Sequence, residues 1–228
     1  MIVSDILTSA SRLLFDESRV RWTTAELIDY INDAQRVIVT VRPDAAPVTE
    51  TVQLVGGSRQ KLPAGAIRLI RVVRNRSALL NCSAGAAIRF VSRDTMDEED
   101  PNWHASTPST TVKHYMTDTM EPLAFYVWPP VSGTIGANAT AFIDIVCSKV
   151  PTKIASTATT ATLTLPDQYF SPVLDWVLYR AFSKDASYGG DLSKAQMHLS
   201  AFQTVLQVGG QSEAASTVPL ERQTPRAM

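Results

Sequence analysis

The first forty residues carry apolar side chains at the three-to-four-residue spacing of amphipathic helices. A first helix is predicted from the stripe formed by Ile2, Ile6, Ala10, Leu13 and Leu14. Thr23 and Glu26 make a T-x-x-E capping box, which predicts the start of a second helix. Trp22 and Leu27 are placed to form a hydrophobic staple around that box. The second helix is expected to end before Pro43, and its apolar face consists of Leu27, Tyr30, Ile31, Ala34, Ile38 and Val41.

Between about Val48 and Pro151 the pattern changes to short apolar or β-branched runs separated by turn residues. Val48, Val52 and Leu54 alternate with polar neighbours until Gly56 and Gly57 interrupt the run. Further runs span residues 67–73, 88–91, 110–115, 123–128 and 141–146, and turn residues occupy 63–65, 81–85 and 129–136. This punctuation predicts an antiparallel sandwich or a barrel-like sheet. The acidic stretch 94–100 is interpreted as a helical turn or loop on its surface.

The helical period returns after the β-like region. Pro172 is acceptable in the first turn of a helix, and the expected buried face of that helix is Val173, Leu174, Val177, Leu178, Ala181 and Phe182. Gly189 and Gly190 mark a break. The next helix carries a regular apolar seam typical of a helix packed along another, formed by Leu192, Ala195, Leu199, Phe202 and Leu206. Gly209 and Gly210 are predicted to form its C-cap.

These zones together predict an α+β fold. Residues 1–45 and 166–210 are expected to form a helical bundle, and residues 46–165 an inserted antiparallel β domain. Residues 211–228 are expected to form an extended C-terminal arm. The arm holds little apolar material beyond Val218 and Leu220, so we expect it to be disordered alone and ordered only against a partner.

Composition places the chain among ordinary globular proteins. Its 228 residues are 45% hydrophobic and 19% charged, with a formal net charge of −1 that calls for no nucleic acid or anionic membrane. Cys82 and Cys147 belong to no metal or redox motif and are expected to be free thiols. The N-terminus lacks a basic region and is interrupted by Asp5, so no signal peptide is expected. No apolar run approaches the roughly 20 residues that span a bilayer.

Residues that could carry chemistry are few. His104 and His114 lie ten residues apart near the acidic stretch, but the spacing matches no metal or acid–base motif, so a solvated surface is the favoured interpretation. His198 is interpreted as an ordinary helix-surface residue. The chain contains no G-x-S-x-G elbow and no phosphate-binding loop. We therefore predict no catalytic, cofactor-binding or metal-binding residues, and a protein that is not an enzyme.

A basic stretch is the most pronounced charge feature. The stretch from Thr51 to Arg93 contains no acidic residue. It contains eight basic residues, namely Arg59, Lys61, Arg68, Arg71, Arg74, Arg76, Arg89 and Arg93. A phosphate-contacting surface would look like this. Strand alternation predicts Arg68 and Arg74 on one side and Arg71 on the other. Pairing with the acidic stretch 94–100 of the same chain or of a neighbouring copy is favoured over DNA contact. Phe125, Tyr126 and Trp128 are interpreted as a strand that ends in a rigid Pro129–Pro130 turn, not as a base-stacking platform.

Five segments resemble a family of phage head-to-tail adaptor proteins of short-tailed phages, in the same order and up to about residue 208. They are R-P-D-A at 42–45, R-Q-K-L-P-A-G-A-I-R-L-I-R-V-V-R-N at 59–75, P-N-W-H at 101–104, F-Y-V-W-P-P at 125–130 and V-L-Y-R-A-F-S-K-D-A at 177–186. The resemblance implies a structural protein of the virion neck, assembled in the host cytoplasm. It also implies a ring, commonly of twelve copies, that joins the portal to the tail nozzle or tube. DNA passes through the centre of such a ring, and Arg59, Lys61, Arg68, Arg71, Arg74 and Arg76 are candidates for its lumen or for contacts between subunits.

The resemblance also implies that the C-terminal segment reaches the portal. Candidate contacts are Val218, Pro219, Leu220, Arg222 and Arg226. Two other functions stay open. One is a tail or capsid accessory protein that binds carbohydrate or the shell, for which Trp103 and Trp128 would be platforms, although core positions are favoured for both. The other is a metal-dependent nuclease that uses carboxylates of the acidic stretch.

Overall fold

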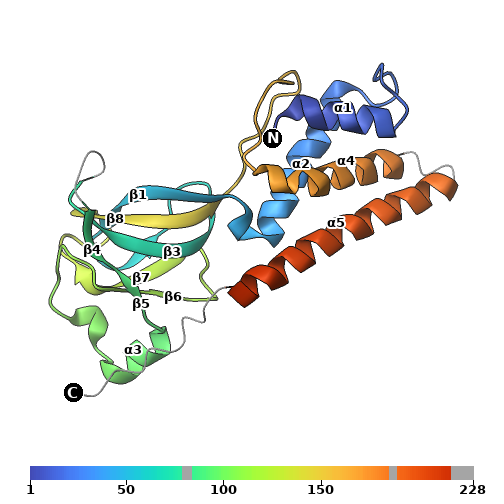
Figure 1. Cartoon of the computed structure of the whole chain (residues 1–228). Helices are drawn as coiled ribbons and strands as arrows, with labels where there is room; N and C mark the ends of the chain where they lie inside the picture. Colours follow the sequence, from blue (N-terminus) through green and yellow to red (C-terminus); the bar gives the residue numbers. More distant parts are fainter. Residues whose placement is uncertain (79–83, 185–188, 217–228) are drawn as a thin grey trace. The chain divides into compact units, whose positions relative to one another are not determined.

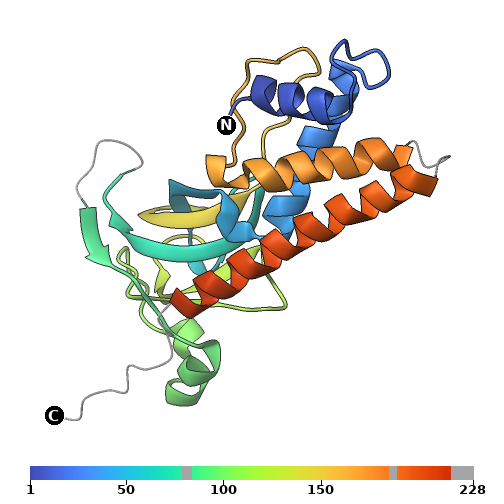
Figure 2. The same ribbon diagram turned by 45° about the vertical axis from the view of Figure 1, so that its right-hand side comes forward.

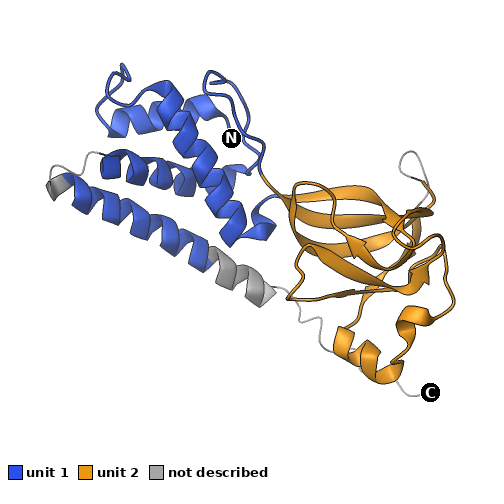
Figure 3. Cartoon of the chain, turned by 180° about the vertical axis from the view of Figure 1, so that it is seen from behind, with its two compact units in different colours: residues 1–46, 151–228 blue, residues 47–150 orange. Residues whose placement is uncertain are grey.

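The computed structural model describes residues 1–78, 84–184 and 189–216, with side chains up to 208 in the last range (Figure 1). This part of the chain contains five α-helices and two four-stranded sheets, so the fold is α+β as predicted. It divides into two compact units (Figure 3), one formed by Met1–Ala46 with Pro151–Met228 and the other by Pro47–Val150. No helix within the described ranges is long and apolar enough to cross a membrane.

The helical unit contains α1 (Val3–Leu13), α2 (Thr24–Val41), α4 (Phe170–Lys184) and α5 (Gly189–Ser216). Helix α4 contacts each of the other three, and α4 and α5 lie side by side as a hairpin (Figure 2). Burial of Val173, Val177 and Leu178 explains this central position of α4. The predicted cap is formed in half: Thr23 Oγ1 accepts a hydrogen bond from the Glu26 amide at 3.4 Å, whereas the Glu26 carboxylate binds Tyr30 and Lys184.

Helix α5 departs from the predicted seam and from its predicted end. Ala195, Phe202 and Leu206 are buried, but Leu199 is only partly buried and Leu192 is 49% exposed. The helix also continues through Gly209 and Gly210 to Ser216, because glycine weakens a helix interior by about 1 kcal/mol without ending it. Residues 211–216 are therefore helical and not an extended arm. The portal-contact candidates Val218, Pro219, Leu220, Arg222 and Arg226 lie outside the described residues.

Residues 151–165, which the sequence pattern assigned to the β domain, belong to the helical unit. Their backbone is bonded to the N-terminal segment: Val3 N donates to Ala161 O and Leu163 N to Met1 O, both at 3.0 Å. Buried Asn32 of α2 holds the other end, since its amide nitrogen donates to Ile154 O at 2.9 Å and its oxygen accepts from Ile154 N at 2.8 Å. These contacts, more than apolar periodicity, decide where the segment packs.

The β unit is a sandwich of two sheets. One has the order β1-β8-β3-β4 and the other β2-β7-β6-β5, and every pairing is antiparallel except the short parallel pair β5–β6. The strand bounds are Pro47–Val55 for β1, Gly57–Lys61 for β2, Ala66–Arg76 for β3, Ala84–Ala87 for β4, Arg89–Phe90 for β5, His114–Thr117 for β6, Ala124–Val131 for β7 and Asn138–Lys149 for β8. The shared core includes Leu69, Val72 and Ile145 from one sheet and Phe125 and Val127 from the other.

Two predicted turns differ in the structure. Strand β2 starts at Gly57, where we expected only a break, and Gly57 adopts a φ of 102° that favours glycine. Strand β7 runs through Pro129 and Pro130 to Val131, where we expected a turn. The backbone still finds partners there, since Ser109 N donates to Pro130 O at 2.9 Å.

The acidic stretch forms a short helix, α3 (Arg93–Glu99), on the outer face of the β2-β7-β6-β5 sheet. Buried Met96 and Trp103 pack there against Met116, with Tyr126 and Trp128 beside them. The β unit thus has three layers, namely α3, the β2-β7-β6-β5 sheet and the β1-β8-β3-β4 sheet (Figure 1).

Candidate interaction surfaces

The basic stretch of the sequence is divided between the two outer faces of the sandwich. Gln60 is 2% exposed and pairs in register with Phe125 of the core, so its neighbours Arg59 and Lys61 point outward from the β2-β7-β6-β5 sheet. The arginines of β3 lie on the other sheet. The six candidate residues therefore do not form one patch.

Bulges in β3 gather its arginines on one face. Register shifts follow Ala66, Leu69 and Val72, so the residues that pair with the inward side chains of β8 recur every three positions. Inward pairs are Leu69 with Cys147, Val72 with Ile145 and Asn75 with Ile143. Outward pairs are Arg68 with Ser148, Arg71 with Val146, Arg74 with Asp144 and Arg76 with Phe142. The prediction that Arg71 faces away from Arg68 and Arg74 was wrong, because it assumed an unbroken two-residue period.

A buried carboxylate organises part of this outer face. Asp144 is 4% exposed, and its oxygens accept hydrogen bonds from Arg76 Nε at 2.8 Å and from Thr51 Oγ1 at 2.7 Å. Arg74 Nε lies 3.5 Å from the same carboxylate. A buried charge must be paired in this way to be tolerated. Arg68 and Arg71, by contrast, are exposed and form no ion pair with any described residue.

Arg59 and Arg93 of the basic stretch form ion pairs beside the β2-β7-β6-β5 sheet. Arg59 makes two hydrogen bonds to Glu121, at 3.0 and 3.2 Å, which raise the pKa of Arg59 and lower the pKa of Glu121. Arg93 pairs with Asp118 at 2.7 Å and lies 3.6 Å from Asp97. Asp97 is the one partner that belongs to the acidic stretch, so pairing within the chain accounts for little of that acidic charge among the described residues.

Helix α3 presents acidic side chains to solvent. Because successive helical residues are rotated by about 100°, Asp94 and Glu98 lie opposite buried Met96 and point away from the sheet. Both are exposed, and neither forms an ion pair with a described residue. No group of three or more His, Cys, Asp or Glu side chains that could hold a metal ion occurs in the described ranges.

The two histidines near α3 occupy separate aromatic contacts. His104 stacks on Trp103 at 3.6 Å between ring centroids, and its Nδ1 lies 2.8 Å from Ser58 Oγ. Burial, and then Arg93, lower the pKa of His104. His114 stacks on Trp128 at 5.6 Å, and burial is again the main cause of its lowered pKa. These contacts fit packing roles for both rings.

The proposed carbohydrate platforms are not open aromatic surfaces. Trp103 is fully buried and donates its indole N–H to Asp97 at 2.6 Å. Trp128 is partly buried against His114, with Lys113 Nζ 5.4 Å from its ring centre. Trp103 is therefore a core residue, as favoured from the sequence.

His198 and Cys147 are both structural. His198 is not a simple helix-surface residue, because its Nδ1 lies 2.9 Å from Asp175 of α4 and its ring stacks on Phe182. Cys147 is a buried free thiol, and burial together with Glu50 raises its pKa to about 11. Cys82 lies outside the described residues.

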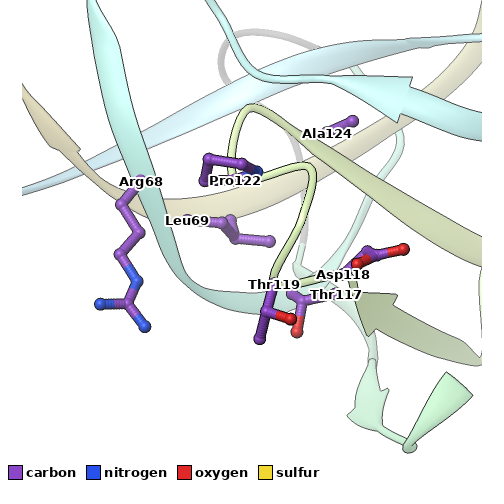
Figure 4. A pocket seen from close by; sticks show the side chains of 7 residues that line it. All are labelled: Arg68, Leu69, Thr117, Asp118, Thr119, Pro122 and Ala124. Atoms are coloured by element: carbon purple, nitrogen blue, oxygen red, sulfur yellow. The ribbon is translucent and has the colours of Figure 1, made fainter.

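A pocket of about 380 Å³ opens between β3 and the turn that joins β6 to β7 (Figure 4). Its lining is Arg68, Leu69, Thr117, Asp118, Thr119, Pro122 and Ala124. Asp118 is the only carboxylate in that lining, and it already binds Arg93 and the Met120 amide. The pocket thus presents no free acid or base beside a nucleophile.

The loop from Leu14 to Trp22, called the Phe15 loop below, is a surface that sequence reasoning missed. Phe15 is 96% exposed and Val20 is 80% exposed. Phe15 and Arg19 both have φ values of 54°, which non-glycine residues seldom adopt. Large apolar side chains held in solvent by an unfavourable backbone are a feature of binding sites.

Specific hydrogen bonds keep the Phe15 loop in shape. The Asp16 carboxylate accepts from the amides of Val20, Arg21 and Trp22 at 2.9–3.0 Å, and these bonds lower the pKa of Asp16. Buried Trp22 donates its indole N–H to Ala181 O of α4 at 3.3 Å. The signal in the sequence was a Phe–Asp pair just after an amphipathic helix, where Asp can cap the following amides.

Comparison with known proteins adds one match. A family model described as SU10 adaptor protein matches residues 1–223, which include both units. A search of curated proteins found no relative. The match extends past the segments on which the resemblance was first noted and includes most of the C-terminal arm.

Proposed function

The chain belongs to the SU10 adaptor protein family, a phage head-to-tail adaptor family, and on that premise we propose that it forms a ring beneath the portal and joins the portal to the tail. Family membership gives the coarser statement directly: the protein is a phage adaptor of the virion neck that associates with portal and tail components. The observation that carries the proposal is a family match that covers both units.

The architecture suits a ring subunit that connects two different structures. Each unit has its own buried apolar residues, so one chain offers two compact bodies. A ring needs heterologous contacts that close by rotation, and twelve copies is the number we propose. The channel of that ring lets the genomic DNA pass without sequence-specific contact. Such a role is structural and requires no catalytic group.

Two segments are proposed to make the contacts with partner proteins. The Phe15 loop offers a preformed apolar anchor on the helical unit, and aromatic anchors dominate the binding energy of many interfaces. The segment after Ser216 is proposed to reach the portal, with Val218 and Leu220 as small apolar anchors and Arg222 and Arg226 facing acidic groups. Helix α5 carries that segment away from the α4–α5 turn.

The test is assembly with the portal of the same phage. The isolated chain is expected to be a monomer or low oligomer, and to form a ring visible by electron microscopy only when the purified portal is added. A variant truncated after Ser216 should bind the portal more weakly. A variant that carries a short tag added after Met228 serves as the control for a changed C-terminus. A stable ring without portal contradicts portal-dependent assembly, and undiminished binding by the truncated chain assigns attachment to the described residues instead.

A further inference from the structure

We propose that neighbouring copies in the ring contact one another through opposite sides of the β unit, with Arg68 and Arg71 of one copy facing Asp94 and Glu98 of the next. The contact joins the outer face of the β1-β8-β3-β4 sheet to the solvent side of α3. The inference rests on the proposed ring, and it names the surfaces that close it.

Both surfaces hold charge that the described part of the chain leaves unpaired. On the sheet, Asp144 engages Arg74 and Arg76, whereas Arg68 and Arg71 are exposed and form no ion pair with a described residue. On α3, Asp97 is engaged by Trp103 and Arg93, so Asp94 and Glu98 are left as free anions. Arg68 with Arg71 and Asp94 with Glu98 thus form two exposed pairs of opposite charge.

The two surfaces lie on opposite sides of one body. Helix α3 packs on the outside of the β2-β7-β6-β5 sheet through Met96, whereas Arg68 and Arg71 project from the outside of the other sheet. Strand β3 and helix α3 belong to different layers of the β unit (Figure 1), although Arg68 also lines the pocket between β3 and the β6–β7 turn. No ion pair joins Arg68 or Arg71 to Asp94 or Glu98 among the described residues, and the two pairs can meet between copies in the head-to-tail manner that a cyclic ring requires.

The spacing of the charges also matches. Asp94 and Glu98 are four residues apart on a helix, which places their Cβ atoms about 5–6 Å apart. Arg68 and Arg71 are opposite Ser148 and Val146, two residues apart on β8, which corresponds to about 7 Å. Long arginine side chains span the difference. Two like charges at i and i+4 weaken a short helix such as α3, and an opposing pair removes that cost.

A second copy explains more of the surface than DNA does. DNA phosphates would satisfy Arg68 and Arg71 but would leave Asp94 and Glu98 unpaired and repelled. A neighbouring copy satisfies all four residues at once. Exposed ion pairs contribute little affinity each, but they set register and exclude wrong orientations, which is what a repeated ring contact needs.

Charge reversal with complementation tests the contact. Variant A carries Arg68→Glu and Arg71→Glu, and variant B carries Asp94→Lys and Glu98→Lys. Each variant alone places like charges at every contact, so neither should form rings on the portal at concentrations at which the unmodified chain does. An equimolar mixture of A and B should form them again, because every contact in an alternating ring is then complementary. Alternation needs an even copy number, and twelve is even.

A matched control changes the same amount of charge elsewhere. Arg36→Glu with Lys153→Glu alters two exposed cations of the helical unit and should leave assembly within twofold of the unmodified chain. Restoration by mixing also shows that both A and B are folded. A ring from A alone or B alone, or no ring from their mixture, overturns the inference while leaving the ring itself intact. If variant A forms rings that no longer bind a DNA duplex, the face that carries Arg68 and Arg71 contacts DNA, and the inference is overturned as well. Failure of the unmodified chain to form any ring overturns the proposed function as well.

Discussion

Replacing Asn32 with alanine tests how the segment after the β unit is fixed to the helical unit. The Asn32 side chain is 4% exposed and makes two hydrogen bonds to one residue, donating to Ile154 O at 2.9 Å and accepting from Ile154 N at 2.8 Å. Ile154 is itself buried, at 7% exposure. Alanine preserves the helix but leaves both backbone groups of Ile154 without their partner.

The expected loss of stability follows from those two groups. A buried donor or acceptor that loses its partner costs about 1–3 kcal/mol. Two such groups give about 2–6 kcal/mol, and water that reaches the edge of the site reduces this toward the lower end. Alanine favours a helix more than asparagine by only a few tenths of a kcal/mol, which does not offset the loss. We therefore expect Asn32→Ala to lower the free energy of unfolding by about 2–5 kcal/mol.

Urea unfolding followed by circular dichroism at 222 nm measures this loss, since most helix lies in the helical unit. The matched control is Asp33→Ala, the next residue of α2, which is only partly buried and should change stability by less than about 0.5 kcal/mol. Hydrogen exchange of the Ile154 amide should also accelerate in Asn32→Ala and not in Asp33→Ala. Equal unfolding midpoints for the two variants would refute the reasoning.

Three further predictions concern packing, pH and binding. Phe202→Ala should lower the free energy of unfolding by about 3–5 kcal/mol, because Phe202 is buried and packs on Trp176. Leu199→Ala should lower it by clearly less, because Leu199 is only partly buried. Denaturation midpoints in the reverse order would contradict this prediction. The pKa values of His104 and His114 are lowered from 6.5, so the unfolded chain binds more protons just below that pH and stability should fall as pH decreases through this range. Urea midpoints at several pH values should show that fall, and the double variant with glutamine at both positions should lose that part of it. Phe15→Ala should leave the melting temperature unchanged or slightly higher, because the side chain is exposed. It should weaken binding to the purified portal or to the purified tail component about tenfold. Unchanged affinity for both partners would show that the Phe15 loop makes no contact with them.

Helical segments could be predicted well because their signals are local. The start of α2 after Thr23 and the buried face that contains Val177 and Leu178 agree with the structure. The predicted stripe of the first helix agrees only in part, because Ile2 and Leu13 are exposed. The end of α5 could not be predicted in this way. A glycine pair is a helix stop only if the chain then turns, and nothing in residues 209–216 decides between turning and continuing.

The β3 strand shows why the face of a side chain is harder to predict than the strand itself. Strand β8 alternates strictly, with Ile143, Ile145 and Cys147 inward. Strand β3 meets it with Leu69, Val72 and Asn75, a period of three, and the difference is absorbed by bulges that periodicity alone does not reveal. The signal was present as R-x-x-R-x-x-R, an arginine before each inward residue, but it is interpretable only once the partner strand is known.

A net charge near zero does not describe how charge is distributed over the surface of the chain. The formal charge of −1 suggests a chain without an electrostatic preference, yet the β unit carries exposed charges without an ion pair among the described residues, cations at Arg68 and Arg71 and anions at Asp94 and Glu98. A protein that binds a different charged partner has no need of both. A subunit that binds copies of itself head to tail must carry both halves of its interface, and the charges of those halves then cancel in the total. Near-neutrality of the whole chain is thus what the proposed contact between copies predicts.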